Sequence, residues 1–539
     1  MKEVNQNFNY LINFLIIIFY ASIFLISINI YKDYNVYSDE TFHRWVGELY
    51  YLHIKEFFLT SNFNNIYLDE ININLNNEGL RAWFIYPVFF DIICEFINDI
   101  FEIKKLDKIY QTRHLINFLI FFISSIYLYT IILKRFDHIF YSLIAVSFYF
   151  FSPRIFGNIF FNSKDILFLS FIVISSYYGF ILLKEKSFRN FFIFSLIAGL
   201  SINIRIMGIF LPLAIYLIII FENLNIKKEL YKDLKNILFS FLIIFLVVFI
   251  FWPYLWSSPL INFFLYLKWL LKEIYVIDNF YLGENFKSNY VPWHYLLVWI
   301  SITLPASVII ISLKGFVYNF FYFFSKILNF KEEQNLWKNN NEKFDLYCFA
   351  VLFLIIIFSF SSSNFGGWRH FYFLFFYIIY FFIFTLAYLN SIKSKLYYKI
   401  LIIFVLLDLI TKIFWIINNH PHQYVYFNNI KKYFVNRSFD LDYFGLSEKA
   451  ALEYILKYDK RSNIKVYSYG YSWLKGSVTM LGDIESKRVT VTSINDSDYV
   501  IDRNVPFHEN KLIDENIFIK YYEIKVDDNI INIIYKKKQ

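Results

Sequence analysis

The sequence has few charged residues, and this scarcity excludes a large class of folds. Charged residues make up 18% of the 539 positions, whereas hydrophobic residues make up 58%. Apolar runs of about twenty residues recur along the chain, and such runs are typical of transmembrane helices. A soluble globular protein is therefore excluded, and the composition predicts a polytopic membrane protein.

Cysteine is also scarce, with Cys94 and Cys348 as its two occurrences. They are far apart in the sequence, and Cys348 lies inside an apolar run. Neither a disulfide framework nor a thiolate metal site is indicated, so redox chemistry is not expected. The sequence shows no internal repeat.

Hydropathy predicts about eleven membrane spans. They are residues 10–30, 114–133, 139–152, 165–183, 190–204, 207–221, 237–256, 294–314, 345–361, 370–390 and 397–417. No small-residue cleavage pattern follows the first span, which predicts a retained signal anchor.

Lysine and arginine collect in short loops that fall on one side if there are eleven spans. These loops are "LKRFDH", "KEKSFR", "NIKKELYKDLK" and "SIKSKLYYK". Basic loops mark the cytoplasmic face. The outer face then receives the first outer loop (31–113), the second outer loop (152–165), the 257–293 loop and everything after residue 418. The net charge of +8 is thus mainly a topology signal, and we expect no nucleic-acid partner.

The region from residue 420 to residue 539 differs in character from the membrane module, residues 1–419. Charges of both signs mix, and alternating patterns in "IKVYSYG", "RVTVTS", "DYVIDR" and "IFIKYYEIKV" predict strands. "GLSEKAALEYILKYD" predicts a helix with Ser447 as its N-cap. The fold class is therefore mainly α, a membrane bundle with outer interfacial helices and a small C-terminal α/β domain outside the cytoplasm.

Asp39 and Glu40 follow the first span in "VYSDETFHRW". The apolar residues after them recur at helical spacing and predict an amphipathic helix in the plane of the membrane interface; they are Phe42, Trp45, Val46, Leu49 and Leu52. Two acids at a helix N-terminus are also favourable with its dipole and need no chemistry. Both interpretations stay open at this point.

Other polar residues fall on the same outer face. Asp165 lies at the outer mouth of the fourth span, and Arg205 interrupts the apolar stretch "GLSINIRIMG". An ionisable residue near the membrane is a functional candidate, although Arg205 can also extend to the interface. Arg369 and His370 follow "NFGGW", which can equally be a turn.

Acids and arginines that converge on the outer face of one bundle would serve glycosyl transfer from a lipid-linked phosphosugar. An acceptor hydroxyl needs a carboxylate to take its proton, and arginines stabilise the departing phosphate. A transporter or flippase is the alternative, and a non-catalytic scaffold is a third class. Transporter sites usually lie near the midplane on paired repeats, which the sequence does not show.

Several segments resemble the bacterial branch of protein O-mannosyltransferase-like (PMT-like) glycosyltransferases of the C superfamily. They are "SDE", "SPRIFGNIFFNSKD", "INIRIMG", "VPWHYLLVWISITLP", "GGWRHFYF" and "HPHQYVYFN … LDYFGLSEKAALEYI". The resemblance implies an inverting membrane transferase that uses a polyprenyl-phosphate-linked sugar, mannose or related, with its active site outside the cytoplasm. It also implies a bacterial inner membrane.

The resemblance also implies roles for individual residues. The family's acidic pair falls on Asp39, the expected catalytic base, and Glu40, and the second-loop acid falls on Asp165. The expected phosphate-binding residues are Arg154, Lys164, Arg205, Arg369 and His370. The 257–293 loop is too short for the β-trefoil of the eukaryotic enzymes, which favours lipid or glycan acceptors over protein acceptors. No cofactor is expected to be required, although carboxylate oxygens suit Mg²⁺ or Mn²⁺.

Overall fold

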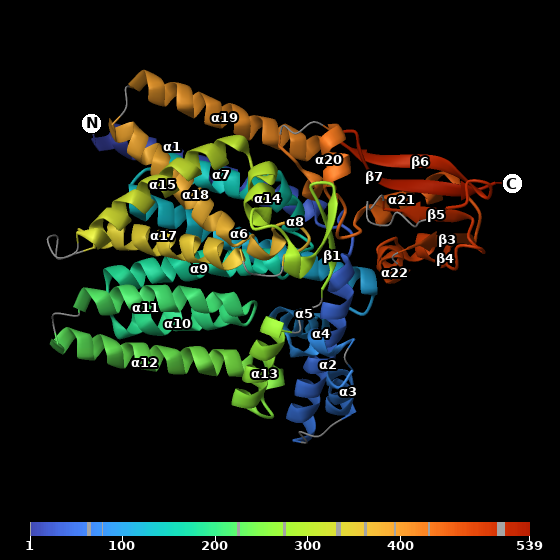
Figure 1. The fold of residues 1–539 in the computed structure, drawn as a ribbon, viewed down its shortest axis with the longest axis horizontal. Helices are drawn as coiled ribbons and strands as arrows, with labels where there is room; N and C mark the ends of the chain where they lie inside the picture. Colours follow the sequence, from blue (N-terminus) through green and yellow to red (C-terminus); the bar gives the residue numbers. More distant parts are fainter. Residues whose placement is uncertain are drawn as a thin grey trace.

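In the computed structural model, a long helical bundle carries a small sheet domain at one end. The structure describes residues 2–61, 66–77, 79–223, 227–272, 276–329, 336–360, 364–392, 395–428, 432–469, 471–503 and 513–538. Figure 1 shows the bundle helices running side by side, with the N-terminus at one end and the C-terminal sheet beyond the other. We call the end of the bundle that faces this sheet the sheet end.

All eleven predicted spans overlap helices of the bundle at least in part. These are α1 (Lys2–Ile30), α6 (Leu106–Phe136), α7 (Ile139–Phe151), α9 (Asp165–Lys184), α10 (Phe188–Ile202), α11 (Phe210–Asn223), α12 (Lys227–Ile250), α15 (Ala306–Leu328), α17 (Asn340–Ser359), α18 (Leu374–Ile392) and α19 (Lys395–Asn418). Eight helices of the described chain are long and apolar enough to cross a membrane. The helices α7 and α10 are shorter apolar helices, and α17 carries three charged residues near its start.

One predicted span is wrong in its position. A single helix was expected over residues 294–314, but α14 (Tyr295–Thr303) ends before Pro305 and α15 starts at Ala306. Proline has no backbone N–H and disfavours helical geometry in the residue before it, and Leu304 is extended (φ −101°, ψ 158°). The candidate span is therefore α15, which runs to Leu328.

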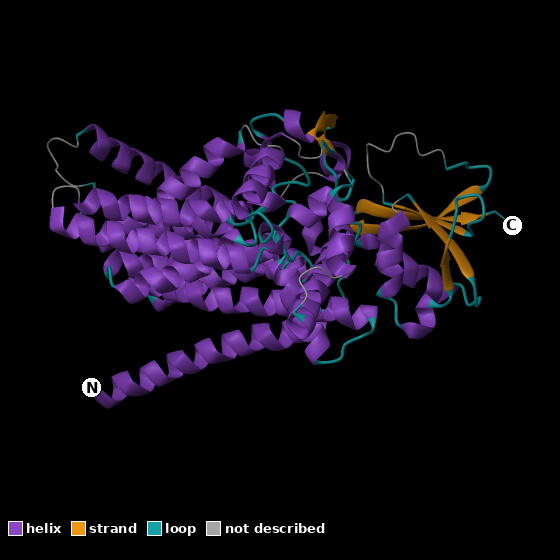
Figure 2. Ribbon diagram, turned by 90° about the horizontal axis from the view of Figure 1, so that it is seen from below, coloured by secondary structure: helices purple, strands orange, loops and turns teal. Residues whose placement is uncertain are grey.

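The helix α1 is the least embedded of the candidate spans, as Figure 2 shows. It lies apart from the other helices along most of its length and approaches them near the sheet end. On its way it meets α6, where the Tyr20 hydroxyl donates to the carbonyl of Ser125 at 3.2 Å.

Short elements cover the sheet end. They are α2 (Ser38–Thr60), α3 (Ile66–Leu75), α4 (Arg81–Ile85), α5 (Phe89–Ile100), α8 (Pro153–Asn158), α13 (Pro259–Lys272), the hairpin β1 (Asp278–Tyr281) with β2 (Glu284–Lys287), and the 3-10 turns η1 (Ile206–Ile209), η2 (Pro253–Leu255), η3 (Ser288–Tyr290), η4 (Arg369–Phe371) and η5 (Gln423–Val425). The predicted amphipathic helix is α2, and it runs across the bundle axis (Figure 1). Its buried residues Val46, Leu49 and Tyr50 pack on Phe84 and Val88.

The C-terminal domain holds a five-stranded mixed sheet in the order β4-β3-β5-β7-β6. Its elements are α20 (Lys432–Ser438), α21 (Ser447–Tyr458), β3 (Ile464–Ser468), α22 (Tyr471–Thr479), α23 (Asp483–Ser486), β4 (Val489–Val491), β5 (Tyr499–Asp502), β6 (Phe518–Val526) and β7 (Asn529–Lys537). The strands β4, β3 and β5 are parallel, and β5, β7 and β6 are antiparallel. The four predicted strands are present, and β7 was not predicted.

The predicted N-cap is also wrong by one position. Ser447 is the first residue of α21 rather than its cap. The carboxylate of Asp442 takes that role, because it accepts from the backbone N–H groups of Leu446 (3.0 Å) and Ser447 (3.1 Å).

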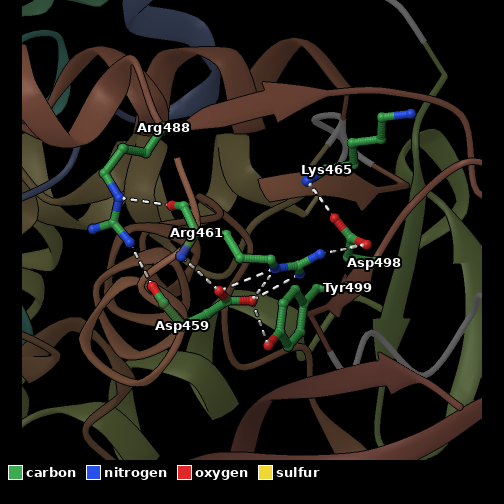
Figure 3. A network of polar contacts seen from close by, with 6 residues as sticks. All are labelled: Asp459, Arg461, Lys465, Arg488, Asp498 and Tyr499. Atoms are coloured by element: carbon green, nitrogen blue, oxygen red, sulfur yellow. Dashed lines mark hydrogen bonds and ion pairs between the residues drawn. The ribbon is translucent and has the colours of Figure 1, made fainter. Parts of the chain in front are cut away.

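An ion-pair network joins the end of α21 to the sheet (Figure 3). The carboxylate of Asp459 accepts from Arg461 at 2.7 Å and from the Tyr499 hydroxyl at 3.1 Å. Arg461 also donates to Asp498 at 3.1 Å, and Asp498 accepts from the backbone of Lys465 at 2.8 Å. These contacts fix α21 against β3 and β5.

Candidate active site

The acidic pair Asp39 and Glu40 lies in the first turn of α2, at the sheet end. The side chain of the N-cap residue Tyr37 makes no capping hydrogen bond, and two carboxylates in the first turn are favourable with the positive end of the helix dipole. Successive residues on a helix point about 100° apart. The two carboxylates therefore meet different surroundings.

Glu40 is fully buried in an ion network. Its carboxylate lies 3.2 Å from Nε2 of His114 and 3.5 Å from Nε of Arg113. Arg113 also pairs with Asp91 at 2.6 Å, and Asp91 pairs with Lys164 at 3.2 Å. Burial opposes the ionisation of Asp91, but Lys164 and Arg113 outweigh it and hold the pKa of Asp91 below its usual value. The network ties α2 to α5 and α6.

Asp39 faces a different side of α2 and is partly exposed. Its Oδ2 lies 3.2 Å from Nη1 of Arg369, and 27% of the Asp39 side chain is accessible. Arg369 starts η4 after Trp368, which follows Gly366 and Gly367; the φ values of these glycines, +64° and +75°, lie in the left-handed region that favours glycine. The predicted turn at "GGW" is therefore present, and it delivers Arg369 to Asp39.

A second carboxylate–arginine pair joins Asp165 and Arg205. Asp165 is the first residue of α9, and its backbone N–H donates to Oδ1 of Asn162 at 3.1 Å, while Nδ2 of Asn162 donates to the Asp165 carboxylate at 3.0 Å. Arg205 lies in the extended link between α10 and η1. Asp165 is thus both a helix-start acid and the partner of a cation.

The two pairs belong to one electrostatic cluster. Burial opposes the charge of Arg369, but Tyr443, Asp39 and Asp165 outweigh it and raise the pKa of Arg369. Burial, followed by the charges of Arg369 and Arg205, lowers the pKa of His370 well below its usual value. His370 is therefore neutral near pH 7, and each carboxylate in the cluster faces a fixed cation.

The remaining two predicted residues lie beside this cluster rather than in it. The guanidinium of Arg154 lies against the neighbouring rings of Trp299 (5.2 Å) and Phe427 (5.0 Å) and donates to the carbonyl of Tyr426 at 3.2 Å. It lines a cavity of about 20 Å³, which is space for a single water-sized group. Lys164 donates to the carbonyl of Pro87 at 2.9 Å as well as to Asp91.

Of the eight site residues predicted from the sequence, the structure brings five together in this cluster: Asp39, Asp165, Arg205, Arg369 and His370. Sequence reasoning missed Arg113 and His114, the partners of Glu40, and Asp91, which pairs with Arg113. A signal for two of them was present, because "QTRHLINFL" places two adjacent basic residues at the start of a span.

A divalent cation would need several hard ligands in one place. Among the described residues, no group of three or more His, Cys, Asp or Glu side chains is arranged to hold a metal ion. Asp39 and Asp165 each pair with an arginine. The cluster therefore does not fit a divalent metal ion, and we derive no step through a metal.

Residues 87–255 match the model of the dolichyl-phosphate-mannose-protein mannosyltransferase family. No curated protein matches the chain. The matched segment runs from α5 to η2 and includes Asp91, Arg113, Asp165 and Arg205. Over this segment the chain is similar to that family of membrane mannosyltransferases.

Proposed function

We propose that this protein transfers a sugar, mannose or related, from a polyprenyl-phosphate-linked donor to an acceptor hydroxyl, with inversion at the anomeric carbon. The observation that carries the proposal is the pairing of the partly exposed Asp39 with the buried Arg369. A carboxylate that can reach a substrate lies there beside a fixed cation. The transfer needs the carboxylate to take the proton of the acceptor hydroxyl and the cation to stabilise the departing phosphate.

The charges at such a site balance during the reaction. Asp39 accepts the proton of the acceptor hydroxyl, whose oxygen attacks the anomeric carbon from the side opposite the phosphate. The bond from that carbon to the phosphate oxygen breaks, and its electron pair stays on the phosphate. Asp39 thereby changes from −1 to neutral while the phosphate changes from a singly charged diester to a doubly charged monoester. Arg369 keeps an anionic partner throughout, because the phosphate gains the charge that Asp39 loses.

The other cluster residues fit supporting roles. Arg205 is the second phosphate-binding cation, and its side chain is 24% accessible. His370, neutral near pH 7, donates or accepts one hydrogen bond to the donor. Asp165 orients Arg205 and the acceptor or the sugar. Glu40 supports the site from behind, because its carboxylate is buried against Arg113 and His114.

The proposed location is a bacterial inner membrane with the sheet end outside the cytoplasm. The basic loops at the ends of α6, α9, α11 and α18 precede helices that return toward the sheet end, although Lys393 lies outside the described residues. Positive loops favour the cytoplasm. The sheet domain then stands over the outer leaflet, and a lipid or glycan acceptor meets the donor there.

Donor turnover in membranes tests the proposal. A panel of labelled polyprenyl-phosphate sugars with a host lipid extract is supplied to membranes that hold equal amounts of wild type, Asp39→Asn or the control Asp99→Asn. Asp99 pairs with Lys55 on the surface of α5 at 2.6 Å, away from the cluster. We expect label transfer with wild type and Asp99→Asn and its loss with Asp39→Asn. No transfer from any donor by folded wild type would overturn the proposal and favour a transporter.

A further inference from the structure

The C-terminal domain places two aromatic side chains against the proposed phosphate-binding arginine. The guanidinium carbon of Arg369 lies 4.8 Å from the ring centroid of Tyr443 and 5.3 Å from that of Phe444. Phe365 contributes a third ring at 5.2 Å. The Nη2 of Arg369 also donates to the Tyr443 hydroxyl at 3.5 Å, while Nη1 points to Asp39.

The segment that carries these rings is fixed on both sides. Toward the C-terminal domain, Gly445 takes a left-handed conformation (φ +71°) and Asp442 caps α21. Toward the bundle, the Phe444 ring meets Tyr37 edge-on at 5.6 Å and Phe161 at 5.3 Å. The backbone on both sides of Tyr443 is therefore held by contacts with α21 and with the bundle.

Arg369 needs such support because its side chain is only 8% accessible. A buried guanidinium is stable only when anions, hydrogen-bond acceptors or aromatic faces surround it. Asp39 supplies one carboxylate, and during the proposed reaction that carboxylate becomes neutral. The rings of Tyr443 and Phe444 do not change charge, so they hold Arg369 through the whole step.

We infer that Tyr443 is a positioning residue that holds the guanidinium of Arg369 against Asp39 and the donor phosphate, so that the C-terminal domain forms part of the transfer site. The inference rests on the proposed function for the role of Arg369. The ring carries most of the effect, because the hydroxyl lies at the long limit of a hydrogen bond.

The magnitude follows from the contact. A desolvated cation–π contact changes an equilibrium by a factor of roughly 30. We therefore expect Tyr443→Leu to weaken donor binding about 10- to 30-fold, read as a higher KM, and Tyr443→Phe to stay within about threefold of wild type. Tyr458→Leu is the matched control, because Tyr458 is 55% exposed on α21 of the same domain.

A double-mutant cycle with Arg369→Met separates positioning from general damage. Full-length proteins in detergent are titrated with a short-chain isoprenyl monophosphate, and donor kinetics are measured on the same four proteins. Tyr443→Leu should weaken binding in the wild-type background and have no further effect in the Arg369→Met background. Equal losses in both backgrounds, or no loss in either, would overturn the inference.

Failure of the inference is distinguishable from failure of the proposed function. If wild type turns over donor and Tyr443→Leu has the same kinetics, the proposed transferase activity stands and the positioning role of Tyr443 is refuted. If wild type neither turns over donor nor binds the monophosphate, the proposed function fails. The melting temperatures of the same four proteins then test whether Tyr443 and Arg369 interact. Non-additive shifts in the double mutant support the interaction, and additive shifts refute it.

Discussion

Asp39 and Glu40 are adjacent in the sequence, but the structure predicts different effects when each is replaced by its amide. We expect Asp39→Asn to lose activity and Glu40→Gln to lose stability. Asp39→Asn and Glu40→Gln each remove one negative charge and keep the shape of the side chain. Asp39 is partly exposed and pairs with Arg369. Glu40 is fully buried between Arg113 and His114.

The magnitudes differ because the surroundings differ. Removing one partner from a buried ion network costs about 3–5 kcal/mol in the free energy of unfolding, so Glu40→Gln should lower the melting temperature strongly. Asp39→Asn leaves Arg369 with the aromatic rings of Phe365, Tyr443 and Phe444, so it should lower the melting temperature less than Glu40→Gln does. Loss of a general base reduces turnover by about 10² to 10⁴-fold, and we expect this loss for Asp39→Asn.

The assay pairs two readouts on the same purified protein. The fraction that stays monodisperse after heating gives the melting temperature, and transfer of labelled sugar gives the turnover per folded molecule. Glu40→Gln should lose stability and keep most of its turnover per folded molecule below its melting point. Equal melting of the two variants, or full turnover by Asp39→Asn, would refute this assignment of roles.

Three further predictions concern packing, pH and metal. Gly157→Ala should destabilise the protein, because a Cβ there would collide with the backbone nitrogen of Tyr424; a melting temperature equal to wild type would contradict this. Burial, opposed by Arg503, raises the pKa of Glu448 to about 7. The folded chain then keeps a proton that the unfolded chain loses above about pH 4.3, so stability should fall as pH rises from about 4.5 to about 7, and Glu448→Gln should flatten that dependence in melting curves; an unchanged slope would count against it. Chelation with EDTA should leave donor turnover unchanged, and a loss restored by Mg²⁺ would show that a metal acts at the site.

The bundle and the strands of the C-terminal domain could be predicted because local patterns determine them. Apolar runs correspond to ten of the eleven bundle helices and overlap the eleventh, α15, in part, while alternation corresponds to β3, β4, β5 and β6. The strand β7 escaped because "NIINIIYKK" does not alternate. The turn before it could have been noticed, because two adjacent aspartates favour a tight hairpin turn. Asp527 and Asp528 form the two-residue loop between β6 and β7, and both have positive φ.

The error in the predicted span 294–314 also has a local cause, which an average of hydropathy over a window does not detect. "WISITLPASVII" is apolar throughout, so a sliding window joins its two halves. The backbone instead stops at Leu304, because Pro305 ends α14 and then starts the next helix. Proline should therefore have divided the prediction at this point.

The roles of individual site residues were beyond the sequence because their partners are distant in it. Asp39 and Glu40 look alike in the sequence, yet one meets Arg369 and the other meets His114. The contact between Arg369 and Tyr443 joins the membrane bundle to a domain that begins after its last helix. If Tyr443 holds Arg369 as inferred above, a substitution in the C-terminal domain changes donor binding while Asp39 is kept.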